Sequence, residues 1–307
     1  MKLLLLGPHG QLGWELRRAL APLGEVIALD RRGDPVRGWC GDLMQPVALA
    51  RTVEALRPDA IVNAAAYTDV DRAEREPGLA MRCNAEAPAA LARAAAQLGA
   101  WLLHYSTDYV FDGSGEHPFD ETAPPAPLNT YGRSKLEGEE RIRASGCRHL
   151  ILRTGWLHAA RGENFVSAML RLGAERERLQ VVADQVGAPT GADLVADLSA
   201  HALRAAMQQP ALAGTYHAAA SGWTSWHGYA LRVFDGARRR GFALRVTPDA
   251  VEPIPSSAWP AAARRPLNGR LDTTRFRAAF GLHLPPWEAG VERLLDERLG
   301  PAQDAGH

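Results

Sequence analysis

The stretch Leu3–Leu16, with the sequence LLLLGPHGQLGWEL, contains the pattern that decides the fold. Its apolar run Leu3–Leu6 predicts a buried strand, and a helix is expected over residues 11–23. Between them lie three glycines spaced GxxGxxG, at residues 7, 10 and 13. Such a turn lets the backbone approach a pyrophosphate, which then binds N–H groups at the positive end of the helix. A tight turn without a ligand is the alternative, and the three glycines alone do not exclude it.

Strand-like and helix-like segments alternate through the rest of the first half. We expect strands over residues 26–29, 60–62, 101–106 and 150–153, and helices over residues 47–57, 85–98 and 131–144. Strands separated by helices at this rhythm predict a doubly wound parallel sheet, an α/β fold of the Rossmann type.

In the second half of the chain, strand-like and helix-like segments alternate less regularly. Helices are expected over residues 164–172, 193–207, 226–239 and 287–298, and strands over 180–182, 215–218 and 244–246, with Pro-rich connections around 253–266. We therefore predict a dinucleotide-binding domain over residues 1–155, to which segments near 180–220 return. A smaller α/β substrate-binding domain takes up most of residues 156–300, and residues 301–307 form a tail.

Composition limits the classes of partner. The 307 residues include 35 Lys and Arg against 35 Asp and Glu, so the formal charge of zero does not favour a nucleic acid or an anionic membrane surface. No apolar run approaches the roughly 20 residues of a membrane-spanning helix, and the N-terminus lacks a signal-peptide pattern. Three scattered cysteines exclude a disulfide scaffold. We expect a cytoplasmic protein.

An acidic residue ends the second expected strand. Asp30 follows Gly13 by 17 residues, close to the roughly 20 expected for a carboxylate that binds the adenosine ribose of a dinucleotide. Arg31 and Arg32 come next and could instead pair with a 2′-phosphate. The choice between NADH and NADPH therefore stays open. Asp42 and Leu43 could flank the adenine, and residues 64–68 pass beside the cofactor.

The sequence Tyr131-Gly132-Arg133-Ser134-Lys135 places a phenol and an ammonium four residues apart at the start of a helix, on one face. Carbonyl reduction needs a proton donor at the oxygen, and a tyrosine suits this role if its proton is made easier to lose. An ammonium about 4 Å away stabilises a phenolate by about 4 kcal/mol at an effective dielectric constant of about 20. Only Lys2 and Lys135 are lysines among the 35 basic side chains, so this spacing is unlikely to arise by chance. A solvated surface pair is the alternative.

Thr107 and Asp108 follow the strand expected over residues 101–106, at the edge where a parallel sheet binds ligands. A hydroxyl there can bind a substrate carbonyl and share the work of orienting it. Trp156 directly follows another strand and could stack on a flat group, although a core role is equally compatible with its position. The ten histidines form no HxxxH pattern and there is no GxSxG, which excludes the common metal-hydrolase and α/β-hydrolase sites.

Taken together, these motifs resemble the dTDP-4-dehydrorhamnose reductase family of extended short-chain dehydrogenases, over roughly residues 1–299. The most specific stretches are the YSTDYVFDG run that begins at Tyr105 and the DQVGAPTG run over residues 184–191. The resemblance implies an NADPH- or NADH-dependent reduction of dTDP-4-dehydro-L-rhamnose, with Tyr131 as proton donor, Lys135 as its partner and Thr107 as the third catalytic residue. It also implies that Thr107, Asp108 and Trp156 contact the sugar nucleotide.

The resemblance further implies a set of cofactor-binding residues drawn from the glycine turn, the strand ends and the catalytic helix. They are Gly7, Gly10, Gln11, Leu12, Gly13, Asp30, Asp42, Leu43, Ala66, Tyr67, Thr68, Tyr131 and Lys135. Two positions depart from the family pattern, because Tyr67 stands where relatives often have histidine and Gly155 where they often have serine. Neither departure removes a catalytic group, but both could shift the fit of the substrate.

Some members of this family form homodimers around Mg²⁺, and the matching positions are Glu15, Asp193 and Glu297. A homodimer with Mg²⁺ is therefore one expectation, and solvated surface carboxylates are the other. Nucleotide-sugar dehydratases usually have a glutamate directly after the Thr-Asp pair. Tyr109 takes that place here, which disfavours dehydration. An NAD-retaining epimerase and a regulatory subunit of the same fold remain as alternatives.

Overall fold

A six-stranded sheet forms the centre of the molecule, for which a computed structural model describes residues 1–302. Every neighbouring pair of its strands is parallel. From edge to edge the strands are β10 (Gly214–His217), β5 (Arg148–Thr154), β4 (Trp101–Thr107), β3 (Ala60–Asn63), β1 (Lys2–Leu6) and β2 (Glu25–Leu29). The chain runs from β1 outward to β2 and then back to β3 on the other side of β1. This reversal makes the carboxyl ends of β1 and β3 the switch point where such sheets bind ligands.

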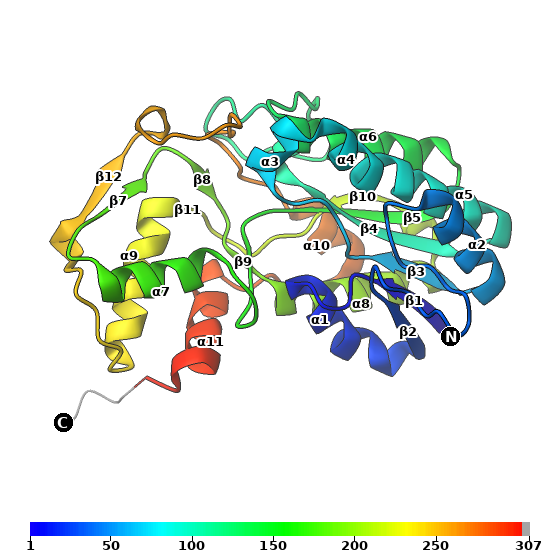
Figure 1. The fold of residues 1–307 in the computed structure, drawn as a ribbon, viewed down its shortest axis with the longest axis horizontal. Coiled ribbons are helices and arrows are strands. Elements are labelled where there is room, and N and C mark those ends of the chain that lie inside the picture. The colour runs from blue at the N-terminus through cyan, green and yellow to red at the C-terminus, as the bar shows by residue number, and fades with distance from the viewer. Residues whose placement is uncertain (303–307) are drawn as a thin grey trace.

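Helices cover both faces of this sheet (Figure 1), which confirms the predicted fold class. One face carries α1 (Gln11–Leu20), α8 (Ala192–Gln208) and α10 (Thr274–Phe280), and the other carries α2 (Pro46–Leu56), α5 (Ala87–Leu98) and α6 (Thr130–Ala144). The apolar run of β1 explains the arrangement, because successive strand side chains point to opposite faces. Leu3 and Leu5 pack beneath α1 and α8, whereas Leu4 and Leu6 pack beneath α2 and α5.

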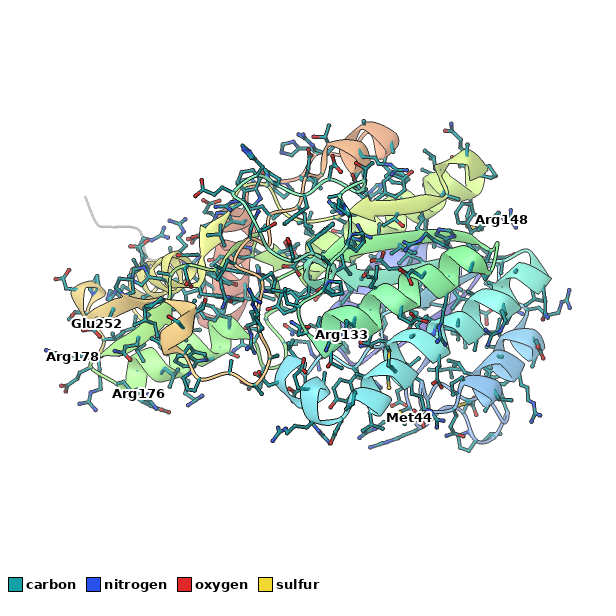
Figure 2. The ribbon with its side chains drawn as sticks, turned by 90° about the horizontal axis from the view of Figure 1, so that it is seen from above. Met44, Arg133, Arg148, Arg176, Arg178 and Glu252 are labelled. Atoms are coloured by element: carbon teal, nitrogen blue, oxygen red, sulfur yellow. The ribbon has the colours of Figure 1, made fainter. Side chains whose placement is uncertain are left out.

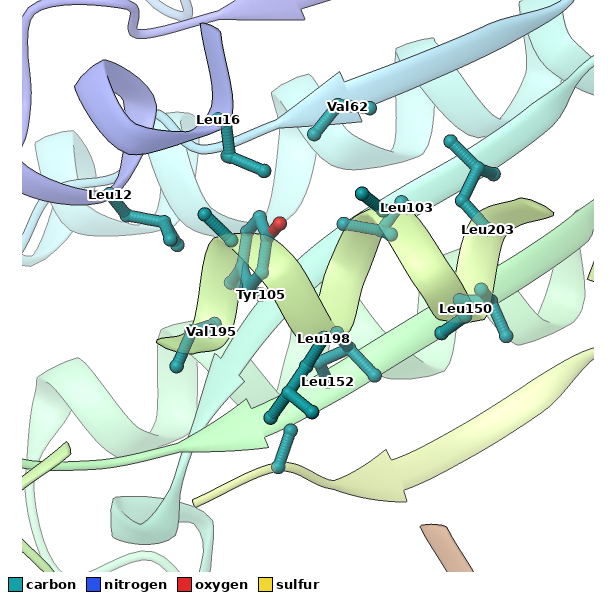
Figure 3. Packing of buried hydrophobic residues seen from close by; sticks show 14 of the residues in the cluster. Leu12, Leu16, Val62, Leu103, Tyr105, Leu150, Leu152, Val195, Leu198 and Leu203 are labelled. Carbon is teal, nitrogen blue, oxygen red and sulfur yellow. The ribbon is translucent and has the colours of Figure 1, made fainter. Parts of the chain in front are cut away.

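The helix α8 lies along the sheet and buries Val195, Leu198 and Leu203 against Leu103 and other leucines of the strands (Figure 3). It belongs to the second half of the chain, as does β10 at the sheet edge. Two short helices, α3 (Val70–Arg75) and α4 (Pro77–Met81), and a π-helical turn over Arg82–Glu86 lie between β3 and α5.

A second hydrophobic core lies among α7 (Phe165–Glu175), α9 (Trp226–Arg239) and α11 (Trp287–Leu299). Three small sheets accompany these helices: β7 (Leu179–Val182) with β12 (Val251–Ile254), β8 (Val186–Gly187) with β11 (Thr224–Ser225), and β6 (Leu157–His158) with β9 (Thr190–Gly191). Viewed from above, Arg176, Arg178 and Glu252 of this part lie at the end of the molecule opposite Arg148 (Figure 2). The division into two domains at residue 155 stays a prediction.

The expected helices and most expected strands are confirmed to within a few residues at their ends. The strand over residues 244–246 is wrong. The backbone N–H groups of Arg245 and Val246 bind the carbonyl of Gly173 in α7, so this segment caps a helix end instead of joining a sheet. The real strand is β12, whose Pro253 is tolerated because β12 pairs only with β7 and lies at an edge. Residues 303–307 of the predicted tail lie outside the described residues.

Among the described residues, 1–302, no helix combines the length and the apolar character that crossing a membrane would require.

Candidate active site

The glycine turn after β1 has the close backbone approaches that its spacing predicts. Gly7 has a φ of 78°, a conformation that favours glycine. A Cβ atom at Gly13 would lie 1.9 Å from the carbonyl oxygen of Gly7, so no other residue fits there. Gly10 precedes α1 and has no side chain to bond the first N–H groups of the helix. These groups therefore remain available for a phosphate, which is the arrangement that a dinucleotide pyrophosphate needs.

A cavity of about 710 Å³ opens at the carboxyl ends of β1, β3, β4 and β5. It brings together eleven of the residues predicted from sequence, from five separate segments of the chain. They are Gly7, Gly10, Gln11, Leu12, Ala66, Thr68, Thr107, Asp108, Tyr131, Lys135 and Trp156. Their assigned roles stay predictions, but the structure places the proposed catalytic residues and the glycine turn around one space.

Five predicted cofactor residues do not line this cavity, and the first two of them lie close behind its wall. Gly13 lies under the turn, against Gly7. Asp30 is half-buried at the end of β2, where its carboxylate accepts a hydrogen bond of 2.8 Å from the backbone of Arg32 and lies 3.4 Å from Nε2 of His9. His9 does line the cavity, and Asp30 contacts His9 from behind, so Asp30 lies next to the edge of the cavity.

The other three lie further back. The carboxylate of Asp42 accepts hydrogen bonds from the backbone of Met44 and the side chain of Gln45. Leu43 is buried in the core beneath α2. The hydroxyl of Tyr67 donates to Glu76 at 2.8 Å. Each of these three side chains is therefore engaged with the protein itself, and any contact they make with a cofactor would have to come from the backbone or after a rearrangement.

Helix α6 positions the phenol and the ammonium. Asn129 caps it by accepting a hydrogen bond of 2.8 Å from the backbone of Gly132, which fixes the first turn where Tyr131 lies. One turn later, Lys135 is 2% exposed, and its Nζ donates to the carbonyl of Tyr105 at 2.6 Å. Burial lowers the pKa of Lys135 to about 8, while the nearby carboxylate of Glu139 opposes this shift. The ammonium is therefore held in place and is the dominant form below that pH.

Thr107 and Asp108 face the phenol from the end of β4. The hydroxyl of Thr107 donates to the Asp108 carboxylate at 2.9 Å and accepts from the backbone of Tyr109 at 3.1 Å. Burial raises the pKa of Asp108 to about 7, and hydrogen bonds, first that of Thr107, oppose the rise. Burial also raises the pKa of Tyr131 to about 12, against a hydrogen bond with Thr107. Tyr131 is therefore protonated at neutral pH, as a proton donor must be.

Two glycines make room for the carboxylate of Asp108. A Cβ atom at Gly155 would lie 2.8 Å from Cγ of Asp108, and one at Gly269 would lie 2.7 Å from its Oδ2. Gly155 is the position where relatives often have serine, so that serine would not fit with Asp108 in its present place. Gly269 is a site residue that sequence reasoning missed, and it comes from a loop more than 150 residues away.

A buried asparagine near the site was also not predicted from the sequence. Asn84, in the π-helical turn, donates to the hydroxyl of Ser134 and to the carbonyl of Tyr67, both at 2.9 Å, and accepts from the backbone of Tyr67 at the same distance. It ties the segment after β3 to the catalytic helix α6. The only signal in the sequence is a polar residue within an alanine-rich stretch. Tyr109, at the position of the dehydratase glutamate, packs edge-on against Tyr131 with ring centroids 5.8 Å apart.

The three residues predicted to hold Mg²⁺ do meet, around a separate small pocket that His158 and Arg293 also line. Their carboxylates are already engaged. Arg293 lies 2.8 Å from Asp193 and 3.0 Å from Glu297, and Arg18 lies 3.7 Å from Glu15. Among residues 1–302, no group of three His, Cys, Asp or Glu side chains has a geometry that could hold a metal ion. The residues as placed form a salt-bridge cluster and do not fit magnesium.

Comparisons with known proteins agree over nearly the whole chain. The family model described as the RmlD substrate binding domain matches residues 1–299. A dTDP-4-dehydrorhamnose reductase from Shigella flexneri is 52% identical over 297 residues, which are 97% of this chain and 98% of that protein. The enzyme of the same name from Escherichia coli K12 is 51% identical, with the same coverage.

Solved structures of similar fold include members of the same family. The dTDP-4-dehydrorhamnose reductase of Bacillus anthracis, in complex with NADP, has a TM-score of 0.84 at 35% identity and covers 96% of this chain and 99% of that one. A Thermus thermophilus UDP-glucose 4-epimerase in complex with NAD has a TM-score of 0.75 at 21% identity, covering 98% of this chain and 99% of that one. This second likeness concerns the fold alone.

Proposed function

The chain belongs to the RmlD substrate-binding-domain family, and on that premise we propose that it is a dTDP-4-dehydrorhamnose reductase. The reaction is the reduction of the C4 ketone of dTDP-4-dehydro-L-rhamnose to dTDP-L-rhamnose with NADPH or NADH. The observation that supports it best is the cavity that Tyr131, Lys135 and Thr107 line together with the glycine turn.

When bound, the reduced nicotinamide supplies the hydride that the carbonyl carbon receives. The protein supplies the proton and the orientation. The hydroxyl of Tyr131 donates its proton to the C4 oxygen, and the Lys135 ammonium, fixed by the Tyr105 carbonyl, stabilises the phenol oxygen as its negative charge develops. For an ammonium and a phenolate about 4 Å apart, at an effective dielectric constant of about 20, such an attraction is about 4 kcal/mol, or about three pKa units, before desolvation opposes it.

Thr107 orients the same oxygen from the other side. Its hydroxyl oxygen accepts a hydrogen bond from the backbone of Tyr109, and its one proton, donated to Asp108 in this structure, would turn to the C4 oxygen when substrate binds. A group held in this way loses little freedom on reaching the transition state. Asp108 and Trp156, at the ends of adjacent strands, are proposed to bind the sugar nucleotide.

The residues around the glycine turn fit a dinucleotide. The turn and the N-terminus of α1 would hold the pyrophosphate, and residues 64–68 would lie beside the rest of the cofactor. Asp30 favours the free ribose of NADH, whereas the exposed side chains of Arg31 and Arg32 favour the 2′-phosphate of NADPH. Both cofactors are therefore expected to work. The epimerase alternative shares only the fold, and an intact Tyr131–Lys135 pair argues against a regulatory subunit.

The proposal is tested by the absorbance of the reduced nicotinamide. With dTDP-4-dehydro-L-rhamnose, the protein is expected to oxidise both NADPH and NADH, one molecule for each sugar reduced. The GDP-linked ketosugar serves as the control for the nucleotide and is expected to react much more slowly. If neither sugar is reduced with either cofactor, the assignment of substrate is wrong even though the fold stands.

We also propose a cytoplasmic homodimer without a nucleic-acid or membrane partner. The family resemblance supports the dimer, and the formal charge of zero supports the absence of polyanionic partners. Because the predicted magnesium ligands are engaged by Arg293 and Arg18, the dimer is not expected to depend on a divalent cation. Sedimentation with and without a chelator checks this. A monomer in both samples would contradict the dimer, and a dimer that dissociates only with the chelator would contradict its independence of divalent cations.

A further inference from the structure

Trp156 has an unusual backbone conformation at the edge of the active-site cavity. Its φ is 49°, and among residues 1–302 the only other non-glycine residue with a positive φ is Arg57, which ends helix α2. Trp156 comes directly after Gly155, whose backbone lies against the carboxylate of Asp108. A bulky residue persists in this region only when its surroundings hold it there, and such conformations cluster at functional sites.

The surroundings of Trp156 are specific. Its indole stacks on that of Trp226, the first residue of α9, with ring centroids 3.5 Å apart and planes 5° from parallel. Both indoles line the cavity that contains Tyr131 and Lys135. Phe165 of α7 packs against Trp226, with ring centroids 4.7 Å apart. The indole of Trp156 is therefore supported from the second hydrophobic core.

The DQVGAPTG run holds both members of this stack. Gln185 is 7% exposed, and its carbonyl oxygen accepts a hydrogen bond of 3.1 Å from Nε1 of Trp226. The amide nitrogen of Gln185 donates to Ser256 at 2.9 Å, which fixes the orientation of the amide. Further along the run, the backbone N–H of Thr190 donates to the carbonyl of Trp156 at 3.2 Å.

Gly187 of the same run leaves the space that the indole of Trp156 fills. A Cβ atom at residue 187 would lie 2.6 Å from Cε2 and 2.7 Å from Nε1 of that ring. Gly187 also pairs with Thr224 in the small antiparallel sheet that leads into α9, so the gap and the stacking partner are built on one unit. Any larger residue at position 187 would push the ring out of the stack.

We propose that Gln185, Gly187 and Trp226 are positioning residues that hold the Trp156 indole as a wall of the active-site cavity, against which the sugar nucleotide binds. This inference rests on the proposed function. Gln185 and Gly187 act through Trp156, and Trp226 supports Trp156 as its stacking partner while also lining the cavity. Loss of any of the three is expected to weaken binding of the sugar nucleotide and to leave the binding of NADPH at the glycine turn unchanged.

The test uses Gly187→Ala and Trp226→Phe in the full-length protein, each with a matched control. Gly78→Ala adds a methyl group where nothing lies within 4 Å, and Trp223→Phe removes an exposed indole that is 45% accessible. In both test variants the KM for dTDP-4-dehydro-L-rhamnose is expected to rise about five- to tenfold, which lies within the range of one aromatic contact. The KM for NADPH and the kcat are expected to stay within about twofold of the parent, and both controls should match the parent.

Circular dichroism supplies a readout that does not depend on turnover. Two indoles stacked face to face couple their electronic transitions, and they give a pair of bands of opposite sign when their transition dipoles are rotated relative to each other about the stacking axis. This pair is expected to vanish in Trp226→Phe, to weaken in Gly187→Ala, and to persist in both controls. Retained kcat and an unchanged far-ultraviolet spectrum outside that pair show that the variants fold.

Two results would overturn the inference, and they differ from failure of the proposed function. If the paired bands are lost but the KM for the sugar nucleotide is unchanged, the stack does not position a binding residue. If the KM values for sugar nucleotide and NADPH rise together, the effect is a general loss of structure. If the parent protein itself reduces no dTDP-ketosugar, the proposed function fails and the inference fails with it.

Discussion

Replacing Tyr131 with phenylalanine is expected to lower kcat by about a thousandfold, within the range measured when a general acid is removed. The variant loses only the hydroxyl that donates a proton to the C4 oxygen. The ring, the helix cap at Asn129 and the glycine turn are unchanged, so the affinity for NADPH should fall far less than kcat even though Tyr131 is also a predicted cofactor-binding residue. Steady-state oxidation of NADPH measures the first quantity, and quenching of protein fluorescence by NADPH measures the second.

Tyr216→Phe is the matched control. That tyrosine is buried in β10, and its hydroxyl donates to the carbonyl of Leu212 at 3.0 Å, away from the active-site cavity. Its loss costs one hydrogen bond, about 1 kcal/mol of stability, and should leave kcat unchanged. Parental kcat in Tyr131→Phe would exclude the phenol as the proton donor. An equal loss of activity in both variants would mean that folding was damaged.

Replacing Lys135 has the second largest expected effect. Lys135→Met removes the charge and is expected to lower kcat by about a thousandfold, because about 4 kcal/mol of attraction between ammonium and phenolate disappears. Lys135→Arg keeps the charge but is still expected to lose most of the activity. The ammonium is 2% exposed and aims one N–H at the Tyr105 carbonyl, and a planar guanidinium does not reproduce that compact geometry.

The chain offers a clean control, since Lys2 is its only other lysine. Nζ of Lys2 donates to the carbonyl of Leu56 at 3.0 Å, far from the cavity, and Lys2→Arg should keep the parental rate. Full activity in Lys135→Arg, measured beside this control, would show that only the charge matters. Full activity in Lys135→Met would remove Lys135 from the mechanism.

The same residue predicts the pH dependence. Lys135 assists only as the charged ammonium, and burial lowers its pKa to about 8. The charged form is the one present below that pH, so kcat/KM should fall as pH rises through about 8. In Lys135→Arg this decline should be absent, because a guanidinium stays charged over the whole range. A decline at the same pH in the arginine variant would assign it to another group.

Local patterns were sufficient to predict the fold. The run Leu3–Leu6 has no polar residue, which is typical of a strand buried on both faces, and its four side chains divide between the two cores. The YxxxK spacing likewise placed Tyr131 and Lys135 on one face of a helix, because four residues make about one helical turn. Both predictions depend only on residues close together in the chain.

The failures involve contacts between distant segments. Residues 244–246 have the apolar character of a strand, but their backbone binds the end of α7, a partner that no local pattern reveals. The space that Gly269 leaves for Asp108 and the link that Asn84 makes to Ser134 also depend on tertiary structure. The cofactor roles of Leu43 and Tyr67 stay predictions; tertiary structure adds that their side chains pack in the core or bond Glu76, which no local pattern indicated.

The predicted magnesium ligands also depend on a distant residue, in this case one of opposite charge. The resemblance implied that Glu15, Asp193 and Glu297 lie close together, and the three residues do line one small pocket. What the pattern did not include is Arg293, whose guanidinium lies between two of the carboxylates. Burial and the two neighbouring carboxylates raise the pKa of Glu15, and the arginines oppose that rise. The same three acidic residues can therefore form a salt-bridge cluster without a metal.

The most direct test of the proposed reduction follows the hydrogen that NADPH transfers to the sugar. The protein is incubated with dTDP-4-dehydro-L-rhamnose and NADPH that carries deuterium at the transferable position, and the sugar is examined by NMR. We expect one deuterium at C4 of dTDP-L-rhamnose for every NADPH oxidised. A product without deuterium at C4, or conversion of the sugar without net loss of NADPH, would contradict it.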